Sequence, residues 1–151
     1  MGDCHDFDRV ISNLSEFCCL AVDLPGHGQT IVHQDSDYQM PNVAQALINL
    51  LIELNIKQCI LLGYSMGGRI ALYLAIHFPQ YFHGVILESA SPGLASQLER
   101  DRRRAKDSKL AEQLESSDFD FANFLQQWYS KALFASLGKH PHYPQAIARR
   151  L

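Results

Sequence analysis

The sequence has little that would suit a membrane protein, a secreted protein or a nucleic-acid-binding protein. No apolar run approaches the roughly 18 residues that a membrane-spanning helix needs. The first ten residues, MGDCHDFDRV, are acidic and lack the apolar segment of a signal peptide. The formal net charge is −3, which gives no general attraction to nucleic acid or to an anionic membrane. These absences predict a cytoplasmic protein that binds neither nucleic acid nor a membrane.

Cysteine is also scarce and lacks the C-x-x-C spacing of a zinc site. Because three of the four lie in apolar runs, FCCLAV and CILLG, we expect buried, reduced thiols in strands. The pair His140 and His142, in KHPHYP, has no apparent third ligand, and no phosphate-binding glycine loop is present. The sequence therefore predicts neither a metal nor a cofactor. The four cysteines are Cys4, Cys18, Cys19 and Cys59.

Apolar segments of two kinds alternate in the first part of the chain. Helical spacing predicts helices over residues 7–14, 41–54 and 66–78. Continuous apolar runs predict buried strands over residues 17–22, 57–63 and 82–88. Strands that alternate with helices are typical of a parallel sheet in an α/β domain.

The composition changes near residue 91. A charged, helix-prone segment that contains RDRRR is followed by an aromatic segment, FDFANFLQQWYSKALFASL, and no further strand is predicted. We therefore expect residues 1–90 to form part of an α/β core and residues 91–151 to form a helical cap.

The pentapeptide GYSMG lies between a predicted strand and a predicted helix. It fits the pattern G-x-S-x-G, in which the serine occupies a tight, strained turn that exposes its hydroxyl. Side chains two residues before and after the serine are expected to clash, which explains Gly63 and Gly67. The turn also directs the backbone N–H of Met66 toward the point where an oxyanion would form. Ser65 is therefore the candidate catalytic residue and Met66 the candidate oxyanion donor.

These motifs, together with AVDLPGHGQT before the serine and ESASPGL and WYSKALFASL after it, resemble the α/β-hydrolase superfamily. Within it, the chain is similar to the 2-succinyl-6-hydroxy-2,4-cyclohexadiene-1-carboxylate synthase family of menaquinone and phylloquinone biosynthesis. The resemblance implies a partial α/β-hydrolase fold with a helical cap. It also implies a lyase that eliminates pyruvate from a small polycarboxylate substrate, with Ser65 acting as a base activated by histidine.

The resemblance further implies a set of substrate-binding residues. Guanidinium groups suit a polyanionic substrate because they pair with carboxylates bidentately. Arg103 lies within a run of charged residues, and such a run usually forms a solvated face. Arg149 is an alternative to Arg150 for the same role. The implied substrate-binding residues are Tyr64, Arg69, Arg103, Trp128 and Arg150.

The histidine and acid that would complete the triad have no evident place in the chain. His77 is expected at the far end of the helix that follows Ser65, and His83 at the wrong end of a strand. A triad of Ser65, Glu88 and His140 is an alternative. The favoured interpretation is that the chain is a fragment of a longer enzyme, truncated at both ends relative to the family.

Two other functions remain open from the sequence. The chain could belong to a serine hydrolase, such as an esterase, a thioesterase or a C–C bond hydrolase, because the serine motif is common to all of them. It could also be a catalytically inactive remnant or a binding module that keeps the pocket without the triad. The sequence does not indicate the oligomeric state.

Overall fold

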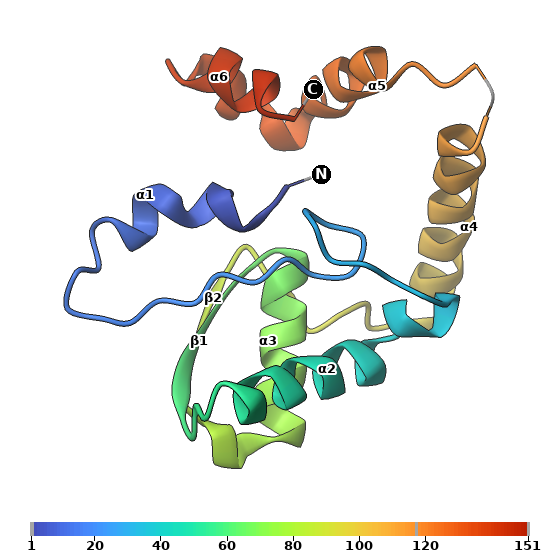
Figure 1. The fold of residues 1–151 in the computed structure, drawn as a ribbon. Coiled ribbons are helices and arrows are strands. Elements are labelled where there is room, and N and C mark those ends of the chain that lie inside the picture. The colour runs from blue at the N-terminus through green and yellow to red at the C-terminus, as the bar shows by residue number, and fades with distance from the viewer. Residues whose placement is uncertain (1, 117, 151) are drawn as a thin grey trace. The chain divides into compact units, whose positions relative to one another are not determined.

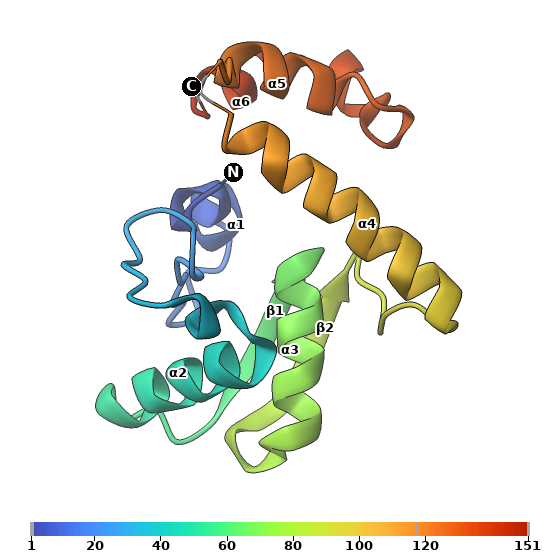
Figure 2. The same cartoon turned by 90° about the vertical axis from the view of Figure 1, so that its right-hand side faces the viewer.

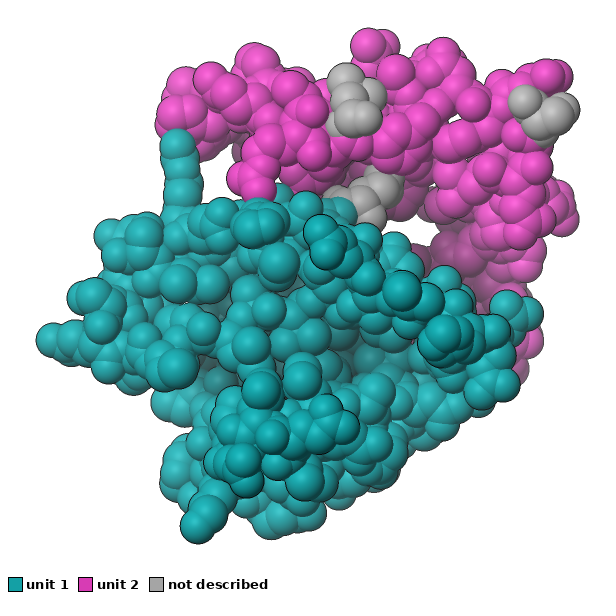
Figure 3. Space-filling view, in the orientation of Figure 1, with its two compact units in different colours: residues 1–93 teal, residues 94–151 magenta. Residues whose placement is uncertain are grey.

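The computed structural model describes residues 2–116 and 118–150 of the chain. The chain divides into two compact units, residues 1–93 and 94–151 (Figure 3). The described part of the first unit contains both strands, and the described part of the second is helical. No helix among the described residues is long and apolar enough to cross a membrane.

The first unit is built on a short parallel sheet. Strands β1 and β2 run side by side, with Leu61 opposite Val85 and Tyr64 opposite Glu88. Helix α3 connects the two strands and packs against both of them (Figures 1 and 2). In chain order the unit contains a 3-10 helix Cys4–Phe7, α1 Asp8–Ile11, a 3-10 helix Asp35–Tyr38, α2 Met40–Glu53, β1 Cys59–Tyr64, α3 Met66–His77, a 3-10 helix Pro79–Tyr81 and β2 Phe82–Glu88.

The core of this unit lies between α2, α3 and the sheet. Apolar residues at helical spacing on α2 meet Ile70 and Leu74 of α3, and Leu61 of β1 packs against the same cluster. Ile48 is almost completely buried, at 2% exposure. The side of the sheet that this cluster does not cover stays open, because Ile60, Leu62 and Ile86 are about half exposed. The buried residues of α2 are Val43, Ala44, Ile48 and Leu51.

The predicted helices over 41–54 and 66–78 and the predicted strands over 57–63 and 82–88 are confirmed to within two residues. Pro41 occupies the first turn of α2, where its missing N–H costs nothing. The parallel α/β arrangement is confirmed as well.

The predicted strand over residues 17–22 is wrong. This segment has no regular secondary structure, and Phe17 and Leu20 are 62% and 51% exposed. An extended run becomes a strand only where a neighbouring strand pairs with its backbone groups, and no described strand does so here. Cys18 and Cys19 are exposed for the same reason, so their predicted burial is also wrong. The predicted helix over 7–14 is shorter, ending at Ile11.

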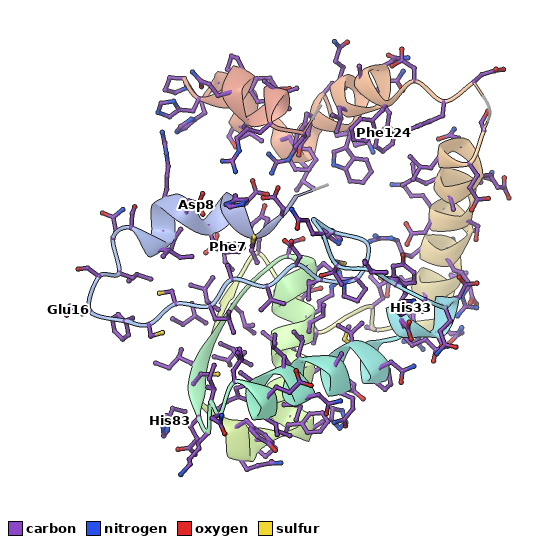
Figure 4. All side chains as sticks on the ribbon, viewed as in Figure 1. Phe7, Asp8, Glu16, His33, His83 and Phe124 are labelled. Atoms are coloured by element: carbon purple, nitrogen blue, oxygen red, sulfur yellow. The ribbon has the colours of Figure 1, made fainter. Side chains whose placement is uncertain are left out.

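The second unit is helical, and α5 with the segments on either side of it contains an aromatic cluster. Helix α4 begins with a reciprocal capping box between Ser96 and Glu99 and has no buried residue. On α5, Leu125 is fully buried, and the ring of Phe124 contacts those of Phe119 and Trp128 (Figure 4). The elements are α4 Gln97–Leu114, α5 Phe121–Tyr129, 3-10 helices Ala132–Phe134 and Leu137–Lys139, and α6 Tyr143–Ala148.

Candidate active site

Ser65 occupies the turn between β1 and α3. Its backbone has φ 51° and ψ −111°, in the positive-φ region that residues with a side chain rarely adopt. Tyr64 ends the strand and Met66 begins the helix, so the reversal is completed at this single residue. Backbone strain of this kind persists only where the surroundings enforce it, and it is common at active sites.

Two glycines allow the turn to close, and only one of them is the predicted one. A Cβ on Gly63 would lie 2.5 Å from the Gly67 carbonyl oxygen and 2.6 Å from the Gly68 Cα, both rigid backbone atoms. A Cβ on Gly68 would overlap the Cβ of Ala90. A Cβ on Gly67 would meet no described atom within 4 Å, so its predicted steric role is wrong. Met66, Gly67 and Gly68 begin α3. The sequence does not show which of them faces the strand, because that depends on the rotation of the helix about its axis.

The neighbouring strand fixes the position of the turn. The backbone N–H of Ser65 donates to the backbone carbonyl of Glu88, at 2.9 Å, where β2 ends. The backbone carbonyl of Ser65 in turn accepts from the N–H of Arg69, at 3.3 Å. The turn is thus tied to the strand on one side and to the first turn of α3 on the other.

The chemical groups of the turn are accessible. The Ser65 side chain accepts no capping hydrogen bond from α3, and Ser65 is exposed. Met66 is the first residue of the helix, so its N–H has no intrahelical acceptor, and the helix N-terminus favours negative charge. A hydroxyl and an unsatisfied N–H in adjacent residues can serve a reacting carbonyl or enolate oxygen. Tyr64 and Met66 are themselves 54% and 45% exposed.

Asp23 organises the loop that contains DLPGHG. Its carboxylate accepts from the backbone N–H of Gln29 at 3.1 Å and of Cys4 at 2.7 Å. These donors hold the pKa of the Asp23 carboxyl below its ordinary value. Gly28 has φ 51°, and a Cβ there would overlap the same carboxylate. The sequence interpretation missed this role of Asp23, although D-x-P-G-x-G indicates a tight turn.

None of the histidines of the first unit hydrogen-bonds to Ser65 within its described residues. His27 Nδ1 lies 3.1 Å from the carbonyl oxygen of Pro25, which keeps it within its own loop. His77 ends α3, and its ring contacts that of Tyr73 in a tilted arrangement. His83 lies at the start of β2, the end opposite to Glu88, as Figure 4 shows. The expected positions of His77 and His83 are therefore confirmed.

The predicted substrate-binding arginines differ in their surroundings. Arg69 is exposed one turn into α3, and no described carboxylate forms an ion pair with it. Arg103 Nε donates to both carboxylate oxygens of Asp107, at 2.7 and 2.8 Å, one helical turn away. Exposed pairs of this type contribute about 0.3–0.5 kcal/mol, so an anionic ligand could displace Asp107 at small cost. Arg150 Nη1 donates to the carbonyl of Ala146 at 2.9 Å.

Trp128 lies among aromatic side chains in the second unit. Its ring centroid is 5.8 Å from that of Phe124 and 6.4 Å from that of Phe134. The rings of His140 and His142 lie 5.4 Å apart and are tilted by 44°. The described residues contain no group of three or more side chains that could hold a metal ion.

Comparison with known proteins agrees with the fold and the turn. A family model described as alpha/beta hydrolase fold matches residues 1–147, and the chain therefore belongs to the α/β-hydrolase fold family. The chain is 34% identical over 136 residues to 2-succinyl-6-hydroxy-2,4-cyclohexadiene-1-carboxylate synthase of Citrobacter koseri, which covers 90% of this chain and 52% of the relative. It thus spans about half the length of that relative.

Two further relatives agree with this comparison. The protein PHYLLO, chloroplastic, of Arabidopsis thaliana is 35% identical over 140 residues, covering 88% of this chain and 8% of that protein. The solved structure of MenH from S. aureus matches with a TM-score of 0.86 at 30% identity, over 99% of this chain and 57% of that one. The predicted resemblance to these synthases and the predicted fold class are confirmed.

Proposed function

We propose that the chain forms part of a lyase that eliminates pyruvate from a succinyl-cyclohexene carboxylate in menaquinone or phylloquinone biosynthesis. The observation that carries the proposal is the turn at Ser65, with its positive φ, its exposed hydroxyl and the free N–H of Met66 beside it. The similarity to named synthases supports this reaction in preference to others on the same fold.

In this reaction Ser65 acts as a base. It removes a proton from the carbon next to the succinyl carbonyl, and the negative charge spreads onto that carbonyl oxygen as an enolate. The electron pair then forms the new ring double bond as the C–O bond to pyruvate breaks, and pyruvate leaves as its enolate and takes up a proton. The N–H of Met66 and the positive end of α3 stabilise that charge. Ser65 needs a histidine to accept its own proton, and we propose that this histidine belongs to the part of the family fold that the chain does not span.

The substrate carries several carboxylates, so cationic and hydrogen-bonding side chains are proposed to bind it. Arg69 would supply a guanidinium one turn from Ser65, and Tyr64 a hydroxyl on the opposite side of the serine. In the second unit, the proposed substrate contacts are Arg103, Trp128 and Arg150, and we propose that residues 91–151 act as a cap. The cytoplasmic location stays a prediction, since one relative is named chloroplastic.

The test is pyruvate release, measured with a coupled dehydrogenase, by a fusion that joins this chain to the part of the MenH fold of S. aureus that the chain does not span. The fusion is assayed with the wild-type chain and with Ser65→Ala, Arg69→Met and Arg9→Met. We expect Ser65→Ala to abolish release and Arg69→Met to lower kcat/KM by about 10–100-fold, since a lost charge-assisted hydrogen bond costs about 1.5–3 kcal/mol. Arg9 is exposed in α1 and serves as the matched control. Release that survives Ser65→Ala would contradict the proposal.

The same variants separate the two alternative functions. A serine hydrolase of neutral esters would cleave p-nitrophenyl acetate in a Ser65-dependent manner, and Arg69→Met would leave that cleavage unchanged. A binding module would bind a substrate analogue without turnover, and Ser65→Ala would not affect binding.

A further inference from the structure

Lys131 lies over the ring of Trp128 in the second unit. Its Nζ is 3.6 Å from the ring centroid, well inside the range of a cation–π interaction. In such a contact only the side of the ammonium that points to the ring is occupied. The ammonium has three N–H donors, so donors remain for an anion on the side away from the ring.

The backbone holds the two residues in this arrangement. Lys131 follows the end of α5, and its N–H donates to the carbonyl of Trp128 at 3.4 Å. Its own carbonyl accepts from the N–H of Phe134 at 2.8 Å, which begins the next 3-10 helix. The indole is packed by Phe124 and Phe134, and Phe124 is labelled in Figure 4. The position of the ammonium is therefore set by a turn and a packed ring rather than by a free surface side chain.

The charge of Lys131 is not neutralised by the described part of the chain. Of the other cations in this unit, Arg103 pairs with Asp107 and Arg104 lies 3.8 Å from Asp101. Arg100 donates to the backbone carbonyls of Leu94 and Ala95. No described carboxylate lies within ion-pair distance of Lys131, so an anionic group of a ligand would meet no competitor there.

We propose that Lys131, held against Trp128, binds a carboxylate group of a small dicarboxylate ligand. The ligand class rests on the proposed function, since the substrate proposed there carries a succinyl group. The aromatic surface beside the ammonium lowers the local dielectric, which strengthens the pairing between cation and carboxylate relative to a fully solvated lysine. Lys131 then adds a cation to the arginines already proposed to contact the substrate.

Trp128 is the single tryptophan of the chain, so its fluorescence reports on this site alone. The experiment titrates succinate into the 151-residue chain at constant ionic strength, with the neutral analogue succinamide as a control for non-ionic effects. We expect a saturable change in emission with succinate and none with succinamide. Lys131→Met should weaken the succinate response at least about tenfold, which corresponds to about 1.4 kcal/mol. Lys131→Arg should retain it.

Lys109→Met is the matched control, because Lys109 is an exposed lysine of α4 in the same unit. It should titrate like the wild type, and circular dichroism should show that all variants keep the same helix content. A wild type without a saturable succinate response, or a Lys131→Met variant that titrates like the wild type, would overturn the inference. The readout needs no turnover, so the two proposals fail separately. Succinate binding by the chain through Lys131, together with no Ser65-dependent pyruvate release by the fusion that completes the fold, would refute the proposed reaction alone.

Discussion

The backbone N–H of Ser65 donates to the backbone carbonyl of Glu88 at 2.9 Å, which joins the candidate catalytic turn to the end of the neighbouring strand. Tyr64 pairs with Glu88 in the parallel register, so this hydrogen bond continues the ladder one residue beyond β1. The strained backbone of Ser65 is thereby enforced by the sheet. The same relationship brings the carboxyl ends of both strands to one edge, where ligands bind in open α/β sheets.

Ser65→Gly should stabilise the first unit relative to Ser65→Ala. Glycine adopts φ 51° without steric cost, whereas alanine keeps the strain, so we expect glycine to be favoured by about 1 kcal/mol. Denaturant unfolding of the two variants checks the difference. Equal stability would mean that the surroundings do not strain the serine.

Gly68→Ala should destabilise the first unit, whereas Gly67→Ala should be tolerated. The new methyl group at residue 68 would overlap Ala90 and the backbone of Gly63, which we expect to cost about 1–3 kcal/mol. At residue 67 it would enter open space, with an effect within about 0.5 kcal/mol. Thermal melts of the pair provide the measurement, and a larger loss at residue 67 would contradict the geometry of the turn.

Ile48→Ala should cost about 2–5 kcal/mol of stability, because its side chain is buried between α2 and α3 and a cavity would remain. Ile52 lies one turn further along α2 but is 54% exposed. Ile52→Ala therefore serves as the control, with an expected effect below about 1 kcal/mol. Urea unfolding distinguishes the two, and similar losses would argue against the observed rotation of α2.

Asp23→Asn should lower stability near neutral pH and have less effect in acid. The pKa of Asp23 is depressed in the folded state by the N–H groups of Gln29 and Cys4, so its contribution is present above its ordinary value of 3.8. That contribution is lost as the pH falls through the lowered pKa. Denaturant unfolding from neutral pH into acid should show the difference in unfolding free energy between wild type and Asp23→Asn becoming smaller as the pH falls.

The control for this pH series is Asp118→Asn, which changes the same charge at an exposed residue of the second unit. It should leave the pH dependence of unfolding unchanged. A gap between wild type and Asp23→Asn that stays constant from neutral pH into acid would show that the carboxylate charge has no part in holding the loop.

The local sequence pattern was sufficient to predict those helices and strands whose own residues show the apolar spacing of that element. Helix α2 has apolar residues at helical spacing and Pro41 in its first turn, and β1 and β2 are short apolar runs. The motif GYSMG identified the turn at Ser65 because its constraint is local, within five residues of backbone. The candidate residue and the elements on either side of it could therefore be predicted before the structure.

Contacts between distant segments decided the rest. The run over residues 17–22 has the composition of a strand, but only a neighbouring backbone could have made it one. Gly68, and not Gly67, closes the turn because Ala90 lies against it, 22 residues further along the chain. The position of Asp23, which accepts from the N–H of Cys4, 19 residues earlier, also depends on tertiary packing. The sequence by itself determined the helices on either side of β1, the paired strands and the turn that carries the candidate serine, because these follow from local periodicity and local sterics. Only the tertiary structure decided which side chains meet and which apolar run finds a partner.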